Sequence, residues 1–137
     1  MLREWPNCYF CQLCLRNLET GLHLFTVCPV SCIIWASIRA WSHCPGMNPA
    51  NWETASDLST WFFNLVGNST STAEAKGARS LAILVAWSIW CERNRRIFYD
   101  AVKTTTRIVE EIKENARLWV SAGAKHLATI VDRPSSE

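Results

Sequence analysis

Residues 81–98 read LAILVAWSIWCERNRRIF, an apolar half followed by a strongly charged half. Residues 81–90 are apolar at almost every position, and residues 92–96 read ERNRR. A helix that is apolar nearly all round is typical of the centre of a helical protein. We therefore expect one long helix, from about Ala73 to Tyr99, that forms the most buried element and also carries a basic end.

Amphipathic helices are predicted on both sides of this central helix, each with apolar residues at helical spacing. The first follows Ser31 as N-cap and stops near His43. The second runs from Thr54, with Asp57 as a capping acid, to Gly67, and the last spans residues 105–131. Their apolar stripes are Ile34, Trp35, Ile38 and Trp41; Leu58, Trp61, Phe62, Leu65 and Val66; and Ile108, Ile112, Ala116, Trp119 and Val120.

The chain has the length of one domain, with 137 residues, of which 49% are hydrophobic and 19% charged. This composition excludes a disordered protein, because it supplies enough apolar side chains to offset the entropy of the chain. The uncharged stretch from Leu24 to Ile38 is too short for a membrane span and contains Pro29. No signal peptide is recognisable, so we expect an intracellular protein, in the nucleus rather than the cytoplasm.

Cysteine is concentrated near the N-terminus, where six of the seven cysteines lie within the first 44 residues. Without a secretion signal, a metal site is favoured over a disulfide scaffold. Cys11, Cys14, His23 and Cys28 form the pattern C-x2-C-x8-H-x4-C. Two residues between thiols allow one tight turn to direct both sulfurs at a single point, and the histidine and third thiol complete a tetrahedron. Four protein ligands are typical of structural zinc.

Other cysteines leave the choice of ligands open. Cys8 forms a second C-x2-C pair with Cys11, and Cys32 follows Cys28 at a spacing of four residues. Either could replace one of the four ligands, and a buried free cysteine can also serve simply as a small hydrophobic residue. His43, Cys44 and His126 stand alone in the sequence, and we assign them no role.

These patterns together predict an all-α fold, with a small N-terminal CCHC zinc finger followed by about four helices. Residues 1–30 are expected to form the CCHC zinc-finger lobe. Residues 31–131 should form a helical domain packed on it, and residues 132–137 a tail. No segment outside the finger alternates convincingly between polar and apolar residues, as a strand would.

Three motifs resemble the zinc-binding domain at the C-terminal end of reverse transcriptases of plant LINE-type (non-LTR) retrotransposons. Residues 87–98, WSIWCERNRRIF, are similar to the W-x-x-W-x-E-R-N-x-R-x-F helix of that family, and residues 119–125, WVSAGAK, to its closing segment. The N-terminal motif comprises Trp5-Pro6-Asn7-Cys8, Cys11-Gln12-Leu13-Cys14, Glu19-Thr20, His23-Leu24-Phe25, Cys28-Pro29 and Trp35. The resemblance implies that Cys11, Cys14, His23 and Cys28 hold zinc.

The resemblance also implies a history in RNA-templated DNA synthesis, where this region is thought to hold template RNA or target DNA beside the polymerase. In the family, the polymerase domain precedes this region, whereas the chain begins at Met1, a few residues before Trp5. The catalytic carboxylates of a reverse transcriptase are therefore not expected here. Phosphate-binding loops, nucleophile motifs and clusters of aspartate are also absent from the sequence. We expect no enzymatic activity.

Nucleic acid, RNA or DNA, is the partner that the basic residues indicate, although the net charge is only +2. Residues 76–107 hold seven basic and two acidic residues. Tyr9 and Phe10 beside the first ligand could stack on bases. The candidate phosphate contacts are Arg93, Arg95, Arg96, Lys103 and Arg107. Neutralising about five phosphates predicts a log–log salt slope of about −3.5 for a single strand.

Two further interpretations of the same residues remain open. The basic cluster could be a solvated helix end, and Tyr9 and Phe10 could pack on the finger itself. The chain could also be a degenerate remnant that keeps structural zinc and binds a protein, or a second copy of itself, through exposed apolar surface. No membrane partner is expected.

Overall fold

The computed structural model describes residues 10–15, 19–44, 47–49, 52, 57–66, 72–99 and 101–131. Helices make up the fold, and the described residues form no β-strand, which confirms the all-α prediction. The elements are η1 (His23–Val27, a π-helical turn), α1 (Pro29–Ser42), α2 (Leu58–Val66), α3 (Thr72–Phe98), α4 (Thr105–Ser121) and α5 (Lys125–Val131). None of these helices is long and apolar enough to cross a membrane.

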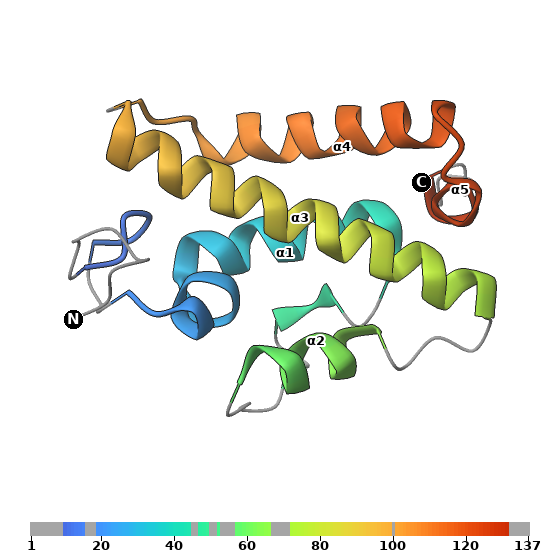
Figure 1. The fold of residues 1–137 in the computed structure, drawn as a ribbon, viewed down its shortest axis with the longest axis horizontal. Coiled ribbons are helices and arrows are strands. Elements are labelled where there is room, and N and C mark those ends of the chain that lie inside the picture. Colours follow the sequence, from blue (N-terminus) through green and yellow to red (C-terminus); the bar gives the residue numbers. More distant parts are fainter. Residues whose placement is uncertain are drawn as a thin grey trace.

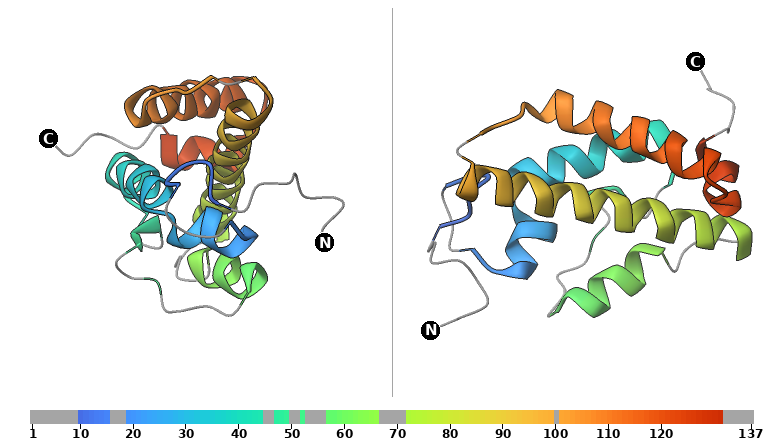
Figure 2. Two further views of the ribbon diagram at one scale, coloured as in Figure 1. Left: turned by 90° about the vertical axis from the view of Figure 1, so that its left-hand side faces the viewer. Right: turned by 45° about the horizontal axis from the view of Figure 1, so that its top comes forward.

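The long helix α3 forms the middle of the molecule, with α4 along one side and α2 on the opposite side (Figure 1). Figure 2 shows that α1 lies beside α3, between the levels of α2 and α4, and that α5 closes the end of the bundle near the start of α3. The core therefore gathers around α3, as its sequence predicts. Its fully buried side chains include Ile34, Trp35, Ile38, Leu81, Val85, Ile89, Ile112 and Leu127.

Helix α3 is the central element, but it is not buried around its whole circumference (Figure 1). Ile83 and Trp87 are 50% and 59% exposed, although Leu81, Val85 and Ile89 of the same helix are fully buried. The neighbouring helices cover only part of the circumference of α3, so one strip of apolar side chains faces solvent. On α4, Trp119 of the predicted apolar stripe is 37% exposed, whereas Val120 packs against the core.

The last predicted helix, residues 105–131, is two helices. Gly123 has a φ of 116°, in the region that favours glycine, and it ends the helical path between α4 and α5. The turn is closed by a hydrogen bond of 2.9 Å from the Ala124 amide to the Trp119 carbonyl. This break lets α5 turn back and pack against the first half of α3.

Helix starts also differ from the prediction at two places. Helix α1 begins at Pro29 with Cys28 as its N-cap, and the Ser31 hydroxyl donates to the Leu24 carbonyl at 2.5 Å instead of capping. Asp57 itself caps α2, because its Oδ1 accepts from the Thr60 amide at 2.8 Å. Thr54 lies outside the described residues.

Three tryptophans hold α1, α2 and the segment between them together. Trp35, Trp52 and Trp61 pack edge to face in all three pairs, with ring centroids 5.3–5.7 Å apart. Such aromatic pairs contribute beyond the area that they bury. At least three of the eight tryptophans therefore contribute to packing in the interior of the molecule.

Candidate metal centre

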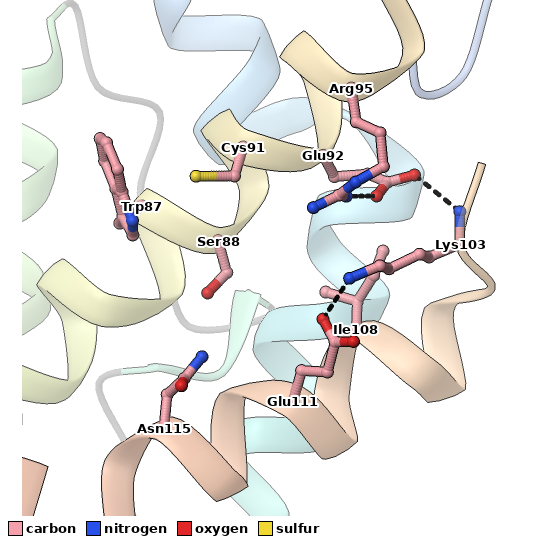
Figure 3. Close-up of a pocket in the computed structure, with 9 residues that line it drawn as sticks. All are labelled: Trp87, Ser88, Cys91, Glu92, Arg95, Lys103, Ile108, Glu111 and Asn115. Atoms are coloured by element: carbon pink, nitrogen blue, oxygen red, sulfur yellow. Dashed lines mark hydrogen bonds and ion pairs between the residues drawn. The ribbon is translucent and has the colours of Figure 1, made fainter. Parts of the chain in front are cut away.

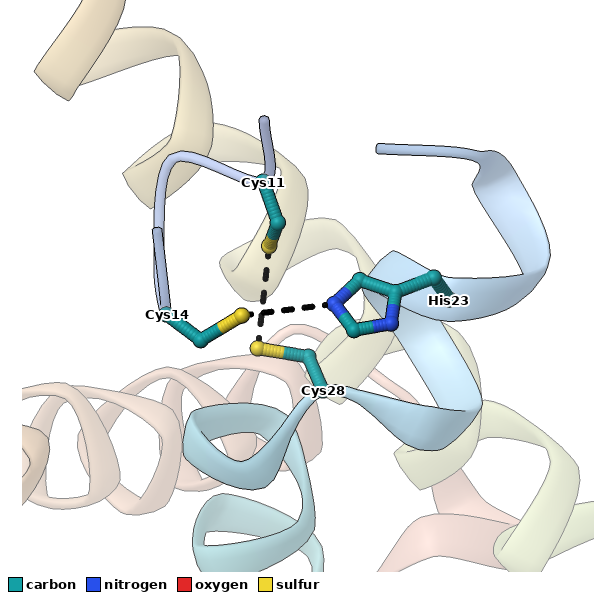
Figure 4. A group of neighbouring side chains, drawn as sticks. All are labelled: Cys11, Cys14, His23 and Cys28. Carbon is teal, nitrogen blue, oxygen red and sulfur yellow. Dashed lines mark hydrogen bonds between the residues drawn. The ribbon is translucent and has the colours of Figure 1, made fainter. Parts of the chain in front are cut away.

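Cys11, Cys14, His23 and Cys28 converge at one end of the molecule (Figure 4). Their candidate ligand atoms all lie within 4.8 Å of one another. The Sγ atoms of Cys11 and Cys28 are 3.7 Å apart, and Cys14 Sγ lies 3.4 Å from His23 Nε2. All three cysteines are free thiols.

These distances agree with a tetrahedral site. Zinc–sulfur bonds of about 2.3 Å at tetrahedral angles separate two sulfurs by about 3.8 Å, and a sulfur and an imidazole nitrogen by about 3.6 Å. A disulfide would instead need a sulfur–sulfur distance of about 2.05 Å. The four residues therefore fit a Cys3His metal site.

A tight turn positions the first two cysteines. The amide of Leu15 donates to the carbonyl of Cys11 at 2.8 Å, which closes one turn around Gln12, Leu13 and Cys14. Leu15 has a φ of 59°, a left-handed conformation that non-glycine residues adopt rarely. The turn brings the thiols of Cys11 and Cys14 to the same side of the loop.

A π-helical turn and the start of α1 position the other two ligands. Thr20 Oγ1 accepts from the amide of His23, the first residue of the turn, at 3.0 Å. The amide of Cys28 then donates to the carbonyl of His23 at 2.7 Å, five residues back. This wide turn leaves the imidazole and the third thiol pointing at the same place, and Cys28 continues directly into α1.

The electrostatics favour a thiolate at Cys28. The hydrogen bond from Cys11 raises the pKa of the Cys11 thiol well above its usual range, and burial raises it further. The same bond lowers the pKa of Cys28 against the opposing effect of burial, and the amides of Ser31 and Val30 at the start of α1 lower it as well. The thiolate is the form in which cysteine binds a metal.

A buried ion pair links this lobe, residues 10–15 and 19–28, to α3. The Arg93 guanidinium lies 2.7 Å from Glu19 Oε2, and neither side chain is exposed. Glu19 Oε1 also accepts from the amide of Gln12 at 3.3 Å, inside the turn that carries the cysteines. Arg93 thus acts through Glu19 on the metal-binding turn.

Arg96 makes a second link to the same turn. Its guanidinium donates to the carbonyls of Gln12 and Leu13 at 3.2 and 3.3 Å. Glu92, itself 1% exposed, accepts from Arg96 Nε at 2.7 Å and from the Lys103 amide at 2.9 Å, and it also pairs with Arg95. We call Arg93 and Arg96, with their partners Glu19 and Glu92, the arginine clamp.

The arginine clamp removes two of the predicted phosphate contacts from the exposed surface. The sequence placed Arg93 and Arg96 among the phosphate contacts, but the Arg93 side chain is fully buried and that of Arg96 is 14% exposed. We therefore remove Arg93 from the candidate contacts and regard Arg96 as a support of the metal lobe. Side chains of Arg95 and Lys103 are 29% exposed and that of Arg107 is 59% exposed. Phe10 is 53% exposed.

One of the two alternative ligands lies away from the centre. Cys32 is outside the cluster, and its thiol donates to the carbonyl of Thr26 at 3.5 Å. Tyr9 and Cys8 lie outside the described residues, so the structure does not test them. From the sequence, no role was expected for Glu19 or Glu92. The burial of Arg93 had a signal in the sequence, because Arg93 follows the buried residues of α3 at a spacing of four.

Comparisons with models of protein families, with curated proteins and with solved structures found no match. The site is therefore characterised from the residues of this chain alone. It consists of four convergent soft ligands, a turn and a helix start that position them, and the arginine clamp that joins them to α3.

Proposed function

We propose that this chain is a non-catalytic zinc-binding module derived from a retrotransposon reverse transcriptase, and that it binds nucleic acid in the nucleus. The observation that carries the proposal is the convergence of Cys11, Cys14, His23 and Cys28 at distances typical of tetrahedral coordination. Thiolates and imidazole are ligands that suit zinc. Four protein ligands leave no position for a water or substrate, so the metal would be structural.

The arginine clamp supports the resemblance to plant LINE-type reverse transcriptases. The resemblance depends on two distant stretches, one with the four ligands and one with the sequence ERNRR. In space these stretches meet, because Arg93 binds Glu19 and Arg96 binds the carbonyls of Gln12 and Leu13. A physical reason thus exists for the two motifs to occur together in one module.

The exposed cations next to the metal lobe support binding of a polyanion. Glu92 is shared by Arg95 and Arg96, and Glu111 by Lys103 and Arg107. Each of these two clusters therefore contains two cations and one carboxylate and has a net charge of about +1. Phosphate contacts from Arg95, Lys103 and Arg107 would give a log–log salt slope of about −2 for a single strand, shallower than the sequence alone predicts.

Two measurements on the full chain test this function. Mass spectrometry under non-denaturing conditions should find one zinc ion per chain, lost when the protein is acidified. Fluorescence anisotropy with labelled single-stranded RNA and DNA should find binding at low salt that weakens with the slope given above. Absence of zinc, or absence of binding to both probes at low salt, would overturn the corresponding half of the proposal.

A second function is favoured by the exposed apolar side chains. On α3, α4 and the segment between them these include Ile83, Trp87, Phe98, Tyr99, Val102 and Leu118, each at least 50% exposed. A chain that keeps structural zinc but uses this surface to bind a protein or a second copy of itself would fit the same fold. Light scattering after size-exclusion chromatography distinguishes the two, since a dimer indifferent to RNA and DNA supports self-association.

A further inference from the structure

A groove between α3 and α4, outside the metal lobe, combines aromatic, polar and cationic side chains (Figure 3). It encloses about 160 Å³ and is open to solvent on one side. Helix α3 contributes Trp87, Ser88 and Arg95 to its lining. Lys103, Glu111 and Asn115 line it from the segment before α4 and from α4 itself. We call it the α3–α4 groove.

Trp87 gives the α3–α4 groove a flat aromatic platform at one end (Figure 3). The side chain is 59% exposed, although Val85 and Ile89 on either side of it in the helix are fully buried. Ile83, one helical turn earlier, is also exposed, so Trp87 belongs to an exposed apolar strip of the kind that marks a binding surface. A nucleobase is a planar partner of suitable shape, and stacking on an aromatic ring is available to every base.

Polar groups stand where the edge of a stacked base would lie. The Ser88 hydroxyl donates to the Leu84 carbonyl at 2.9 Å, which leaves its oxygen able to accept from a ligand. The amide of Asn115 projects into the groove from α4 and offers both a donor and an acceptor (Figure 3). Hydrogen bonds to the exposed edges of unpaired bases are a usual mode of single-strand recognition.

Cations occupy the other end of the α3–α4 groove. Arg95 follows Trp87 by eight residues, which places it about 12 Å further along the axis of α3. Lys103 lies beside it and pairs with Glu111 at 2.6 Å. The carboxylates of Glu92 and Glu111 also line this end, and they balance Arg95 and Lys103. Each carboxylate has a second cationic partner just outside the groove, Arg96 for Glu92 and Arg107 for Glu111, so the region around this end is positive. It is therefore complementary to a phosphate next to the stacked base.

We propose that the α3–α4 groove binds a short stretch of single-stranded nucleic acid, with one unpaired base stacked on Trp87 and its backbone phosphate at Arg95 and Lys103. This inference rests on the proposed function, and it adds to the predicted phosphate contacts Arg95 and Lys103 an aromatic platform, Trp87, that sequence reasoning did not find. The metal lobe has a supporting role, because the clamp residue Arg96 shares Glu92 with Arg95 and donates to the carbonyl of Lys103 at 3.3 Å.

The test uses the zinc-loaded full chain and two fluorescein-labelled probes, ten uridines of RNA and ten thymidines of DNA, in anisotropy titrations. Trp87→Ala should weaken binding about 5- to 150-fold, and Trp87→Phe should weaken it less because a ring remains. Trp119→Ala is the matched control, since Trp119 is an exposed tryptophan of α4 that does not line the groove. It should change the affinity less than about twofold, within the effect of an ordinary surface change.

The cationic end has its own pair of variants. Lys103→Gln should make the salt slope shallower by about 0.7, the value for one phosphate contact on a single strand. Lys125→Gln removes the same charge from the exposed start of α5, outside the groove, and should leave the slope unchanged. Circular dichroism of each variant ensures that the comparison is made on folded protein.

The outcomes separate this inference from the proposed function. If the wild-type chain binds the probes and Trp87→Ala binds equally well, the groove assignment is wrong while nucleic-acid binding stands. If the wild-type chain binds neither probe at low salt, both fail. If Trp87→Ala instead converts a dimer into a monomer and no probe binds, the groove is a self-association surface. Preference for one probe identifies the source of the strand as RNA or DNA.

Discussion

The two ends of α3 are held to the rest of the molecule in different ways. Its first half packs against α5 through small and apolar residues, with Gly77 in close approach to the backbone of His126. Its last turns hold the metal lobe through the arginine clamp, where guanidinium groups meet a buried carboxylate and backbone carbonyls. Apolar packing is non-directional, whereas ion pairs and hydrogen bonds need their partners at fixed positions.

This difference gives a reason for a metal site at one end of α3 only. The turn that presents Gln12 and Leu13 to Arg96 is short and contains a residue in a left-handed conformation. A metal that ties Cys11 and Cys14 to His23 and Cys28 would fix this turn, and so would fix the acceptors of the clamp. The α5 end has no such requirement, because burial of Leu81, Leu127 and Ile130 stabilises it.

Loss of a metal ligand should produce the largest difference between the two ends. In Cys28→Ser the site keeps three ligands, and we expect loss of bound zinc together with fast amide exchange over residues 11–28. Zinc binding to finger peptides has an apparent free energy of about 10–16 kcal/mol, so this lobe should not stay ordered without it. Amides of α5 and of the first half of α3 should keep their protection in hydrogen-exchange mass spectrometry.

The neighbouring cysteine supplies the control for that experiment. Cys32→Ser changes a thiol that lies four residues further on and outside the cluster, so zinc content and exchange should match the wild type. Cys8→Ser tests the remaining alternative ligand in the same way. Equal loss of protection in α5 and in the metal lobe of Cys28→Ser would contradict the two-end comparison.

Breaking the buried ion pair should have the next largest effect. Arg93→Met leaves Glu19 buried without its cation and removes the guanidinium that lies 4.8 Å from the Trp90 ring. Loss of one partner from a buried pair typically destabilises by about 3–5 kcal/mol. The free energy of unfolding from denaturant titration at saturating zinc should fall by that order.

Two variants make the interpretation specific. Arg95→Met changes a partly exposed arginine two residues away and should cost no more than about 1 kcal/mol. Glu19→Gln combined with Arg93→Met removes both charges and should recover much of the loss. A double variant as unstable as Arg93→Met alone would show that the charge of Glu19 is not the cause.

At the clamp end of α3, helical periodicity makes the burial of Arg93 predictable from the sequence but not its pairing with Glu19. Residues at spacing of four in the central helix, Leu81, Val85 and Ile89, are all fully buried, and the same spacing continues to Arg93. Burial of this arginine could therefore have been read from the sequence. Its partner could not, because Glu19 lies 74 residues away and nothing local encodes the pairing.

The candidate metal ligands were predictable for the opposite reason. Their spacing is local, within eighteen residues, and a single short turn and a helix start satisfy its geometry.

The break at Gly123 and the exposure of Trp87 were not predicted. A glycine is tolerated inside a helical pattern, and only its positive φ reveals the turn. A run that is apolar on every side, such as residues 81–90, gives no information about which side is covered.

A substitution at the apolar end should have a smaller effect and an unusual sign. Alanine normally stabilises a helix by about 1 kcal/mol relative to glycine. At Gly77, however, an added Cβ would lie 2.3 Å from the His126 carbonyl oxygen and 2.9 Å from Ile130 Cδ1. The backbone of α5 would have to move, and overpacking of this kind typically costs about 1–3 kcal/mol.

Thermal unfolding of Gly77→Ala should therefore show a lower midpoint than the wild type, while bound zinc is retained. Lys76→Ala alters the exposed neighbour in the same helix and should leave the midpoint almost unchanged. A Gly77→Ala variant more stable than the wild type would mean that α5 does not pack this closely on α3.

The smallest expected effect concerns Glu111 of α4, at neither end of the comparison. A hydrogen bond from Lys103 lowers the pKa of Glu111, and Arg107 contributes further attraction. Because the folded pKa lies below the unfolded one, this carboxylate stabilises the fold above its unfolded pKa, about 4.3, and the stabilisation disappears as the pH falls through the folded pKa. Both partners are partly exposed, so the effect should not exceed about 1 kcal/mol.

The variant Glu111→Gln should accordingly melt slightly below the wild type at pH 6–7. The difference between the two melting temperatures should shrink in high salt and vanish below the folded pKa of Glu111. A difference that persists unchanged in acid would show that packing of the Glu111 side chain, and not its charge, is responsible.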